Sequence, residues 1–231
     1  MNTTAPPIET FTNRVLQGDC ITVMRTMPSE SINLIVTDPP YLVNYRSRDG
    51  RHYPNDNPNT ATWLVPAVAQ MYRVLKQDSF CISFYGFHHT DKFLTAWRSA
   101  GFRTLDLIVW AKQYSSSEGF VLRDHEQAYL LAKGSPKKPR VKLPSVLSEW
   151  KYTGNTLHPT QKPVMALLPL LMAFSQIGDI VLDPFAGSGT TAVAATLLSR
   201  RFIAIELDPK YCAIARTRLN TAHTRRAPHP Q

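Results

Sequence analysis

"GDIVLDPFAGSGTTAVAATLLSR", residues 178–200, is the stretch of the sequence that decides the fold. It starts with a short apolar run of strand type that ends at Asp183. A turn with Gly187 and Gly189 follows, and a helix pattern begins at Thr190. A strand that runs through a glycine turn directly into a helix is a building unit of open α/β sheets. We therefore expect a protein of the α/β class.

Strands and helices keep alternating on both sides of this stretch. The strand-like segments are 32–37, 79–85, 104–112, 126–132, 179–183 and 202–206, and the helix-like segments are roughly 20–27, 63–76, 90–100, 162–175, 189–200 and 209–220. This alternation predicts a doubly wound, mostly parallel sheet. Segments 104–112 and 126–132 have no helix between them, so we expect them to form an antiparallel hairpin.

Two helices carry recognisable end signals, and two long stretches carry none. Thr90 is a candidate N-cap for the helix that Gly101 ends, and Asp208 precedes a proline at the first position of the last helix. Residues 42–61 and 133–161 are polar, basic and rich in proline or glycine. We predict that both of these stretches are irregular.

The composition of the chain is that of an ordinary globular protein. Of its 231 residues 43% are hydrophobic, and no run of eighteen apolar residues or standard signal segment is present. The cysteines, Cys20, Cys81 and Cys212, are far apart and have no metal-ligand spacing. We expect a reduced, cytoplasmic protein that neither spans a membrane nor holds a metal.

The formal net charge of +9 is the first indication of a partner. A large excess of Lys and Arg favours polyanions, above all nucleic acid. Part of the excess is concentrated in "KGSPKKPRVK", residues 133–142, which has five basic residues and no acidic one. The alternative is a soluble protein that is basic without binding nucleic acid.

The glycine turn and the acid one strand later are typical of a site for a nucleoside-containing cofactor. Glycines let the backbone approach a ligand, and a helix N-terminus favours an anionic group. Glu206, at the end of the next strand, can accept both hydroxyls of a ribose. "GSGTTA" also fits a dinucleotide pattern, and a tight strand–helix connection without a ligand is a further alternative. A P-loop is excluded because no Gly-Lys-Ser/Thr is present.

A second strand ends in unusual chemistry at "LIVTDPPYLVNY", residues 34–45. The strand runs into Asp38, and Pro39, Pro40 and Tyr41 follow at once. Proline fixes φ and restricts the residue before it, so the carboxylate stands on a rigid backbone. Ligands of open α/β sheets bind beyond the carboxyl ends of strands. This position therefore predicts a functional role. A dehydrogenase, which transfers hydride, has no use for such a motif, so the motif counts against the dinucleotide pattern in "GSGTTA".

Three motifs together resemble the class beta amino-methyltransferases of DNA. They are "TDPPY" (37–41), "HPTQKP" (158–163) and "DPFAGSGTT" (183–191), in this order. The resemblance covers about residues 15–220 and implies the Rossmann-like fold of S-adenosylmethionine-dependent methyltransferases. It implies one domain over residues 1–231, with a catalytic half (about 15–132), a short DNA-recognition segment (about 133–157) and a cofactor-binding half (about 158–220).

The resemblance implies a role for each catalytic residue. An exocyclic amino group is a poor nucleophile because its lone pair is delocalised into the ring. The carboxylate of Asp38 and the carbonyl of Pro39 would accept its two hydrogens and aim the lone pair at the sulfonium methyl group. Pro39 and Pro40 would keep these acceptors preorganised. Tyr41 would stack on a base flipped out of the duplex.

The resemblance also implies a binding site for S-adenosylmethionine. Asp19 would lie near the adenine, Glu206 at the ribose, and Thr160, Gln161 and Lys162 at the methionine carboxylate. The turn around the methionine part would comprise Asp183, Phe185, Gly187, Gly189 and Thr190. Lys162 could equally be a solvated lysine at a helix start, and His158 could be a general base or a structural residue.

We expect duplex DNA as the substrate, held by two basic stretches. These contain Arg46, Arg48 and Arg51, and Lys137, Lys138, Arg140 and Lys142. The recognition segment is short, which points to loose sequence selectivity or to a homodimer; a cognate restriction endonuclease is a further partner that the family suggests. "DPPY" favours adenine N6 as the target. The alternatives are cytosine amino-methylation, the same chemistry on RNA or a protein glutamine, and a nucleic-acid-binding module without activity.

Overall fold

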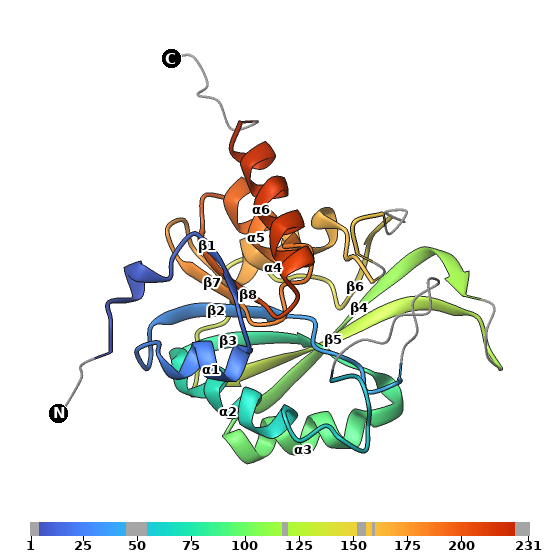
Figure 1. The fold of residues 1–231 in the computed structure, drawn as a ribbon. Helices are drawn as coiled ribbons and strands as arrows, with labels where there is room; N and C mark the ends of the chain where they lie inside the picture. Colours follow the sequence, from blue (N-terminus) through green and yellow to red (C-terminus); the bar gives the residue numbers. More distant parts are fainter. Residues whose placement is uncertain (1–4, 45–54, 117–119, 152–155, 159, 225–231) are drawn as a thin grey trace.

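The computed structural model describes residues 5–44, 55–116, 120–151, 156–158 and 160–224 (Figure 1). Its centre is one eight-stranded sheet in the order β1-β8-β7-β2-β3-β5-β4-β6. The strands are β1 (Arg14–Gln17), β2 (Ile32–Thr37), β3 (Leu75–Phe84), β4 (Arg103–Ser116), β5 (Arg123–Lys133), β6 (Val146–Trp150), β7 (Ile180–Asp183) and β8 (Arg201–Glu206). Only β5 runs antiparallel to its neighbours. The mostly parallel α/β sheet with an antiparallel β4–β5 hairpin is thus confirmed.

Three helices cover each face of the sheet. The helices α1 (Cys20–Arg25), α2 (Leu64–Val74) and α3 (Thr90–Ala100) lie on one face, and α4 (Val164–Phe174), α5 (Thr190–Leu197) and α6 (Pro209–Thr224) lie on the other (Figure 1). Two single-turn helices, η1 (Ile8–Thr10) and η2 (Phe87–His89), precede β1 and α3. In β2, Leu34 and Val36 point to the core under α4–α6 and Ile35 to the core under α1–α3. The central strands are buried on both faces, as doubly wound sheets require.

Several boundaries differ from the sequence-based expectation. The strands β1 and β6 were not predicted, and β6 lies inside the stretch expected to be irregular. Both are short and lie at the two edges of the sheet, where one flank is unpaired and polar residues interrupt the apolar pattern. The helix predicted over 63–76 ends at Val74, and β3 begins at once at Leu75. Strand β4 reaches Ser116, so that β4 and β5 project beyond the sheet as an arm (Figure 1).

The helix end signals are partly confirmed. Gly101 ends α3 in a left-handed conformation with φ of 103°, and the Asp208 carboxylate accepts from Lys210 N at 2.8 Å. Thr90 is not the N-cap of α3: it is the first helical residue, and its hydroxyl donates to the Phe87 carbonyl at 2.8 Å. The single turn of η2 directly before α3 moves the helix start by one residue.

Within the described ranges, no helix is long and apolar enough to cross a membrane. The same part of the chain contains no group of three or more His, Cys, Asp or Glu residues that could hold a metal ion. The three cysteines are buried and unbridged.

Candidate active site

The carboxyl ends of three adjacent strands bring the predicted acidic residues to one edge of the sheet. The order β8-β7-β2 places Glu206, Asp183 and Asp38 at the ends of neighbouring parallel strands. The helices connected to β7 and β8 lie on one face and those connected to β2 on the other, so β7 and β2 form the switch point of the sheet. Residues almost 170 positions apart in the sequence thus share one edge of the sheet, as the strand-end motifs predicted.

The side chain of Asp38 is paired on both of its oxygens. Its Oδ1 accepts from the Tyr41 hydroxyl at 2.9 Å, and its Oδ2 lies 2.8 Å from Lys162 Nζ. Lys162 also donates to the Tyr41 hydroxyl at 3.3 Å. The exposed fraction of the Lys162 side chain is 11% and that of Asp38 is 23%. The structure thus brings Lys162, which was predicted to lie at the cofactor carboxylate, into contact with the predicted catalytic acid.

Aromatic rings enclose this cluster. Lys162 Nζ lies 5.2 Å from the ring centroid of Tyr41, 5.1 Å from that of Phe84 and 5.8 Å from that of Trp150. Phe84 stacks on Trp110 with centroids 4.9 Å apart. These ring faces attract a cation, and of the three rings around the ammonium only that of Tyr41 is not fully buried. The sequence-based analysis did not identify Phe84, Trp110 or Trp150.

The pKa values follow from this burial and pairing. Burial alone would lower the pKa of Lys162, but the nearby carboxylates of Asp38 and Glu126 outweigh it and raise the pKa above its usual value. Burial, assisted by the charge of Asp38, raises the pKa of Tyr41 well above its ordinary value. At neutral pH the ammonium is therefore charged, and the Tyr41 hydroxyl keeps its proton and remains a donor to Asp38.

Two residues outside the motifs hold in place residues 38–44, which we call the catalytic loop because they include the predicted catalytic residues. The buried carboxylate of Asp56 accepts from Leu42 N at 2.6 Å and from Val43 N at 3.2 Å, and it thereby stabilises the left-handed conformation of Leu42 (φ 64°). Gly86 lies against the loop from the other side, where a Cβ would stand 2.8 Å from Tyr41 Cβ and closer still to its carbonyl. A residue larger than glycine would therefore displace Tyr41.

The glycine turn is fixed by the carboxylate at the end of the next strand. Gly187 has a positive φ of 50°, and its N–H donates to Glu206 Oε2 at 2.7 Å. Glu206 Oε1 accepts from Asp208 N at 2.8 Å, so this carboxylate joins the ends of two loops. Burial raises the pKa of Glu206, against hydrogen bonds from the backbone of Asp208 and Gly187. Burial likewise raises the pKa of Asp183 to about 7, against hydrogen bonds from Thr191 and Phe185 N.

Residues 158 and 160–162 lie directly on this turn. A Cβ at Gly187 would be 3.4 Å from the His158 ring, and the Thr190 hydroxyl donates to the Lys162 carbonyl at 3.2 Å. Burial lowers the pKa of His158 to about 4, assisted by the charge of Lys162, so the ring is neutral at pH 7. Gln161 Oε1 is buried and has no hydrogen-bond partner among the described residues. Such an orphaned acceptor is expected where a ligand with a donor group binds.

Asp19 lies at the same edge, one strand further out. It follows β1, whose Gln17 pairs with Glu206, and its carboxylate caps α1 by accepting from Thr22 N and Thr22 Oγ1, both at 2.9 Å. Phe185 leaves the turn toward the opposite helix layer and packs edge-on against Trp63, with ring centroids 5.2 Å apart. Asp19 and Phe185, which were both predicted to contact the cofactor, therefore lie at the same edge of the sheet as Asp38.

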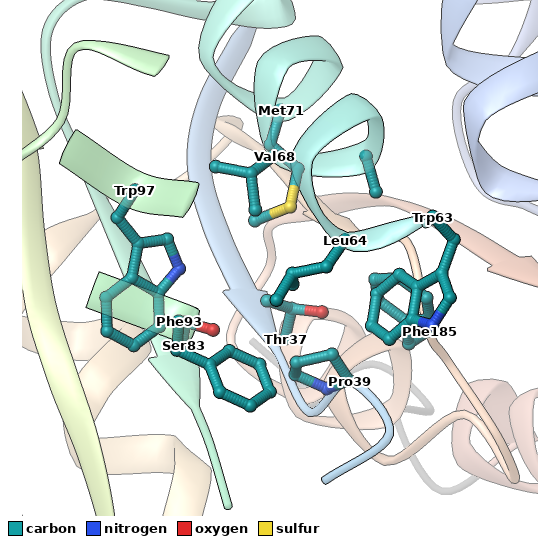
Figure 2. A pocket seen from close by; sticks show the side chains of 11 residues that line it. Thr37, Pro39, Trp63, Leu64, Val68, Met71, Ser83, Phe93, Trp97 and Phe185 are labelled. Atoms are coloured by element: carbon teal, nitrogen blue, oxygen red, sulfur yellow. The ribbon is translucent and has the colours of Figure 1, made fainter. Parts of the chain in front are cut away.

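A small internal cavity lies beneath the catalytic loop (Figure 2). Its walls include Thr37 and Pro39 from the loop strand, Trp63 and Leu64 at the start of α2, and Phe185 from the glycine turn. The volume of about 10 Å³ has room for at most one water molecule. The cavity is thus a packing feature between the two halves of the site and does not provide space for a substrate.

The four predicted DNA-binding residues that the structure describes do not lie at the edge of the sheet that carries Asp38. Lys137, Lys138, Arg140 and Lys142 are exposed, but their segment leaves β5 at the opposite edge, where Ser135 N donates to Asp78 at 2.7 Å. Lys133 pairs with Ser79, in the middle of β3, whereas Thr37 pairs with Ser83, near the end of that strand. Arg46, Arg48 and Arg51 lie outside the described residues.

One basic residue of this stretch has a structural role. Lys133 is buried, and its ammonium donates to the carbonyls of Tyr72 (3.0 Å) and Leu75 (2.8 Å) and pairs with Glu30 at 3.2 Å. It therefore fixes the junction between α2 and β3 and is not available to a phosphate.

Comparison with known proteins identifies relatives over nearly the whole chain. A family model described as "DNA methylase" matches residues 32–217. YubD of Escherichia coli (strain K12) is 49% identical over 207 residues, which are 90% of each chain. The type II methyltransferase M2.MboI of Moraxella bovis is 30% identical, over 88% of this chain and 86% of its own. The DNA adenine methyltransferase YhdJ of Escherichia coli (strain K12) is 28% identical, over 90% and 83%.

Solved structures share the fold at lower identity. A complex of M1.HpyAVI with SAM has a TM-score of 0.71 at 24% identity and covers 90% of this chain and 98% of its own. The cytosine-N4-specific PvuII DNA methyltransferase has a TM-score of 0.72 at 20% identity, over 87% and 84%. Enzymes named for adenine and for cytosine thus both occur among the proteins to which this chain is similar.

Proposed function

This chain belongs to the DNA methylase family, and we propose that it transfers the methyl group of S-adenosylmethionine to the N6 amino group of adenine in duplex DNA. The observation that carries the proposal is the position of Asp38. Its carboxylate stands on a proline-stiffened loop at the end of β2, directly beside the glycine turn that follows β7. A group that accepts hydrogen bonds from an amine therefore adjoins a cradle for a cofactor.

The catalytic residues would act on the amine by preorganised hydrogen bonding. The Asp38 carboxylate and the Pro39 carbonyl would accept its two hydrogens and pull the nitrogen toward tetrahedral geometry. The ring of Tyr41 would stack on a base that has been flipped out of the duplex, since an amine inside the stack cannot be reached. The bound cofactor supplies the electrophilic methyl group.

The cofactor would lie across the ends of β7, β8 and β1. Gly187 and Gly189 would allow its amino-acid part to approach the start of α5, where Gln161 contributes an unpaired acceptor. Glu206 would accept the ribose hydroxyls, and Asp19 would lie near the adenine ring. This arrangement is supported by the positive φ of both glycines and by the orphaned Gln161 oxygen.

Replacement of Glu206 by alanine is expected to weaken S-adenosylmethionine binding by about 1–3 kcal/mol, as for a lost hydrogen-bonded carboxylate. The change also removes the acceptor of Gly187 N and Asp208 N, so the turn itself is loosened. Calorimetry measures the affinity. Glu206→Gln keeps one backbone acceptor and is expected to bind more tightly than Glu206→Ala. Unchanged affinity in both variants would contradict the assignment of the cofactor site.

The choice of adenine over cytosine rests on the aspartate at position 38, which the resemblance associates with adenine. It can be tested with synthetic duplexes that contain only A·T or only G·C pairs and with methyl-labelled cofactor. We expect label in the A·T duplexes. Label in the G·C duplexes alone would favour amino-methylation of cytosine, and label in neither, with normal cofactor binding, would favour a requirement for a mixed recognition sequence.

We further propose that the basic segment, residues 133–142, contributes sequence-independent phosphate contacts. Because the segment begins at the edge opposite Asp38, these contacts would lie away from the flipped nucleotide, on phosphates further along the duplex. A homodimer would combine two such surfaces, and a cognate restriction endonuclease and a cytoplasmic location remain further expectations of the same proposal.

The variant with Lys137, Lys138 and Arg140 all changed to alanine tests this contact. If the three side chains neutralise phosphates, the slope of log K against log salt becomes shallower by about 0.9 for each lost contact. DNA affinity over a salt series measures the slope, and calorimetry with S-adenosylmethionine serves as the control for folding. An unchanged slope would mean that the segment is a solvated loop and that DNA is held elsewhere.

A further inference from the structure

Lys162 occupies the place that the proposed reaction assigns to the target amine. Its ammonium donates to Asp38 Oδ2 at 2.8 Å and lies against the rings of Tyr41, Phe84 and Trp150. Asp38 is the same acceptor that the amino group would use, and Tyr41 carries the ring face that the plane of a base would use. The lysine and the base therefore compete for one position.

The pair between Lys162 and Asp38 does not open without compensation. Both side chains are largely buried. Separating a buried ion pair costs more free energy than separating an exposed pair, because water does not replace the lost partner. Three ring faces add to the attraction of the cation. Entry of a base thus requires a second group that takes over the ammonium.

The backbone of Lys162 lies at the cofactor cradle. Its carbonyl accepts from the Thr190 hydroxyl, at the first residue of α5, and its neighbour Gln161 has the orphaned oxygen. The His158 ring of the same segment lies against Gly187. A lysine side chain is a flexible four-carbon stem with an ammonium at its end. From this anchored backbone it can turn from Asp38 to a carboxylate bound at the glycine turn.

We propose that Lys162 is a switch between two carboxylates: it covers Asp38 while the cofactor site is empty, and the methionine carboxylate of the bound cofactor draws it away and uncovers Asp38 for the amine. This inference rests on the proposed function. The alternative of a solvated lysine at a helix start is wrong, since the Lys162 side chain is only 11% exposed and paired with Asp38.

The switch couples the two sites. In the wild type, part of the affinity for the cofactor is lost because its carboxylate competes with Asp38 for the ammonium. A variant without the Asp38 charge then binds the cofactor more tightly, although Asp38 does not touch it. We expect a gain of about three- to tenfold, and tenfold corresponds to about 1.4 kcal/mol.

Calorimetry without DNA tests the switch, with two ligands that differ in one group. S-adenosylhomocysteine carries the carboxylate and no sulfonium charge, and S-adenosyl-3-thiopropylamine is the same molecule without the carboxylate. We expect Asp38→Asn to tighten S-adenosylhomocysteine about three- to tenfold and Lys162→Met to weaken it about tenfold. The affinity of the decarboxylated ligand should stay within about twofold in both variants.

The double variant Asp38→Asn/Lys162→Met decides between coupling and independent effects. With Lys162 absent, the change at Asp38 is expected to have no effect on S-adenosylhomocysteine. Lys133→Met is the matched control, because Lys133 is likewise buried and paired with a carboxylate, but at the edge of the sheet opposite Asp38.

Two outcomes would overturn the proposal. An equal effect of Asp38→Asn with and without Lys162 would show that the lysine does not connect the sites. Unchanged S-adenosylhomocysteine binding in Lys162→Met would show that the carboxylate does not draw on it. Failure of the cofactor site is a separate result, because the wild type would then bind neither ligand, and a different target base would leave both affinities unchanged.

Discussion

Replacement of Asp38 by alanine is expected to lower the rate of methyl transfer about 100- to 1000-fold, the usual effect of removing one preorganised acceptor from an active site. The reason is that Asp38 acts on the amine, so its loss leaves the amino group planar and poorly nucleophilic. Binding of S-adenosylhomocysteine should not be weakened, and the release of Lys162 should tighten it. Single-turnover rates with saturating labelled cofactor and calorimetry separate these two effects.

The same substitution has a cost in stability that must be kept apart from its effect on the rate. Asp38→Ala leaves the Lys162 ammonium, only 11% exposed, without its carboxylate partner, and a broken buried pair typically costs about 3–5 kcal/mol. The partial exposure of Asp38 places the expected loss at the lower end. Asp38→Ala/Lys162→Met should recover most of the stability in thermal unfolding but none of the activity. Activity of Asp38→Ala above about a tenth of the wild type would contradict the catalytic role.

Replacement of Gly86 by alanine is expected to lower the rate at least about tenfold although Gly86 carries no chemistry. A Cβ at this position would stand 2.8 Å from Tyr41 Cβ. Two carbon atoms at this distance clash, so Tyr41 and its carbonyl must move. A displacement of about 1 Å at an active site can cost on the order of 100-fold in rate. Because the glycine turn is untouched, cofactor affinity measured by calorimetry should stay within a few-fold.

Gly178→Ala is the matched control for this variant. Gly178 has a positive φ of 84° and open space around its Cβ position, so alanine there strains the backbone without reaching the site. It should lower the stability by about 1 kcal/mol and leave the rate unchanged. If both variants lose stability and neither loses activity, the contact between Gly86 and Tyr41 does not position the catalytic loop.

The predictions from the sequence worked best where local pattern and chemistry coincide. The apolar run before Asp183, the glycines after it and the proline-stopped strand before Asp38 each fix an element and a functional end together. For this reason the α/β class, the antiparallel hairpin and the common edge of Asp38, Asp183 and Glu206 could be predicted. The edge strands β1 and β6 could not be predicted, because four or five residues are too few to show a clear alternation of apolar and polar side chains.

The partners of Asp38 could not be predicted, because they depend on tertiary packing. Lys162 lies 124 positions further along the chain, and the local motif alone cannot show which carboxylate its ammonium meets. Trp150 reaches the site only because β6 pairs with β4. Asp56 and Gly86 act through one backbone segment, and single carboxylates and glycines between helices and strands are too common to stand out. The signal that could have pointed to Trp150 is a tryptophan in a stretch otherwise expected to be polar.

Analysis of the methylated nucleoside tests the central claim most directly. The purified chain is incubated with methyl-labelled S-adenosylmethionine and mixed-sequence duplex DNA, and the DNA is then digested to nucleosides and separated. We predict that the label migrates with N6-methyldeoxyadenosine and that the Asp38→Ala variant produces almost none. Label in N4-methyldeoxycytidine would contradict the choice of base, and label in a ring-carbon product, or equal labelling by the variant, would contradict the mechanism at Asp38.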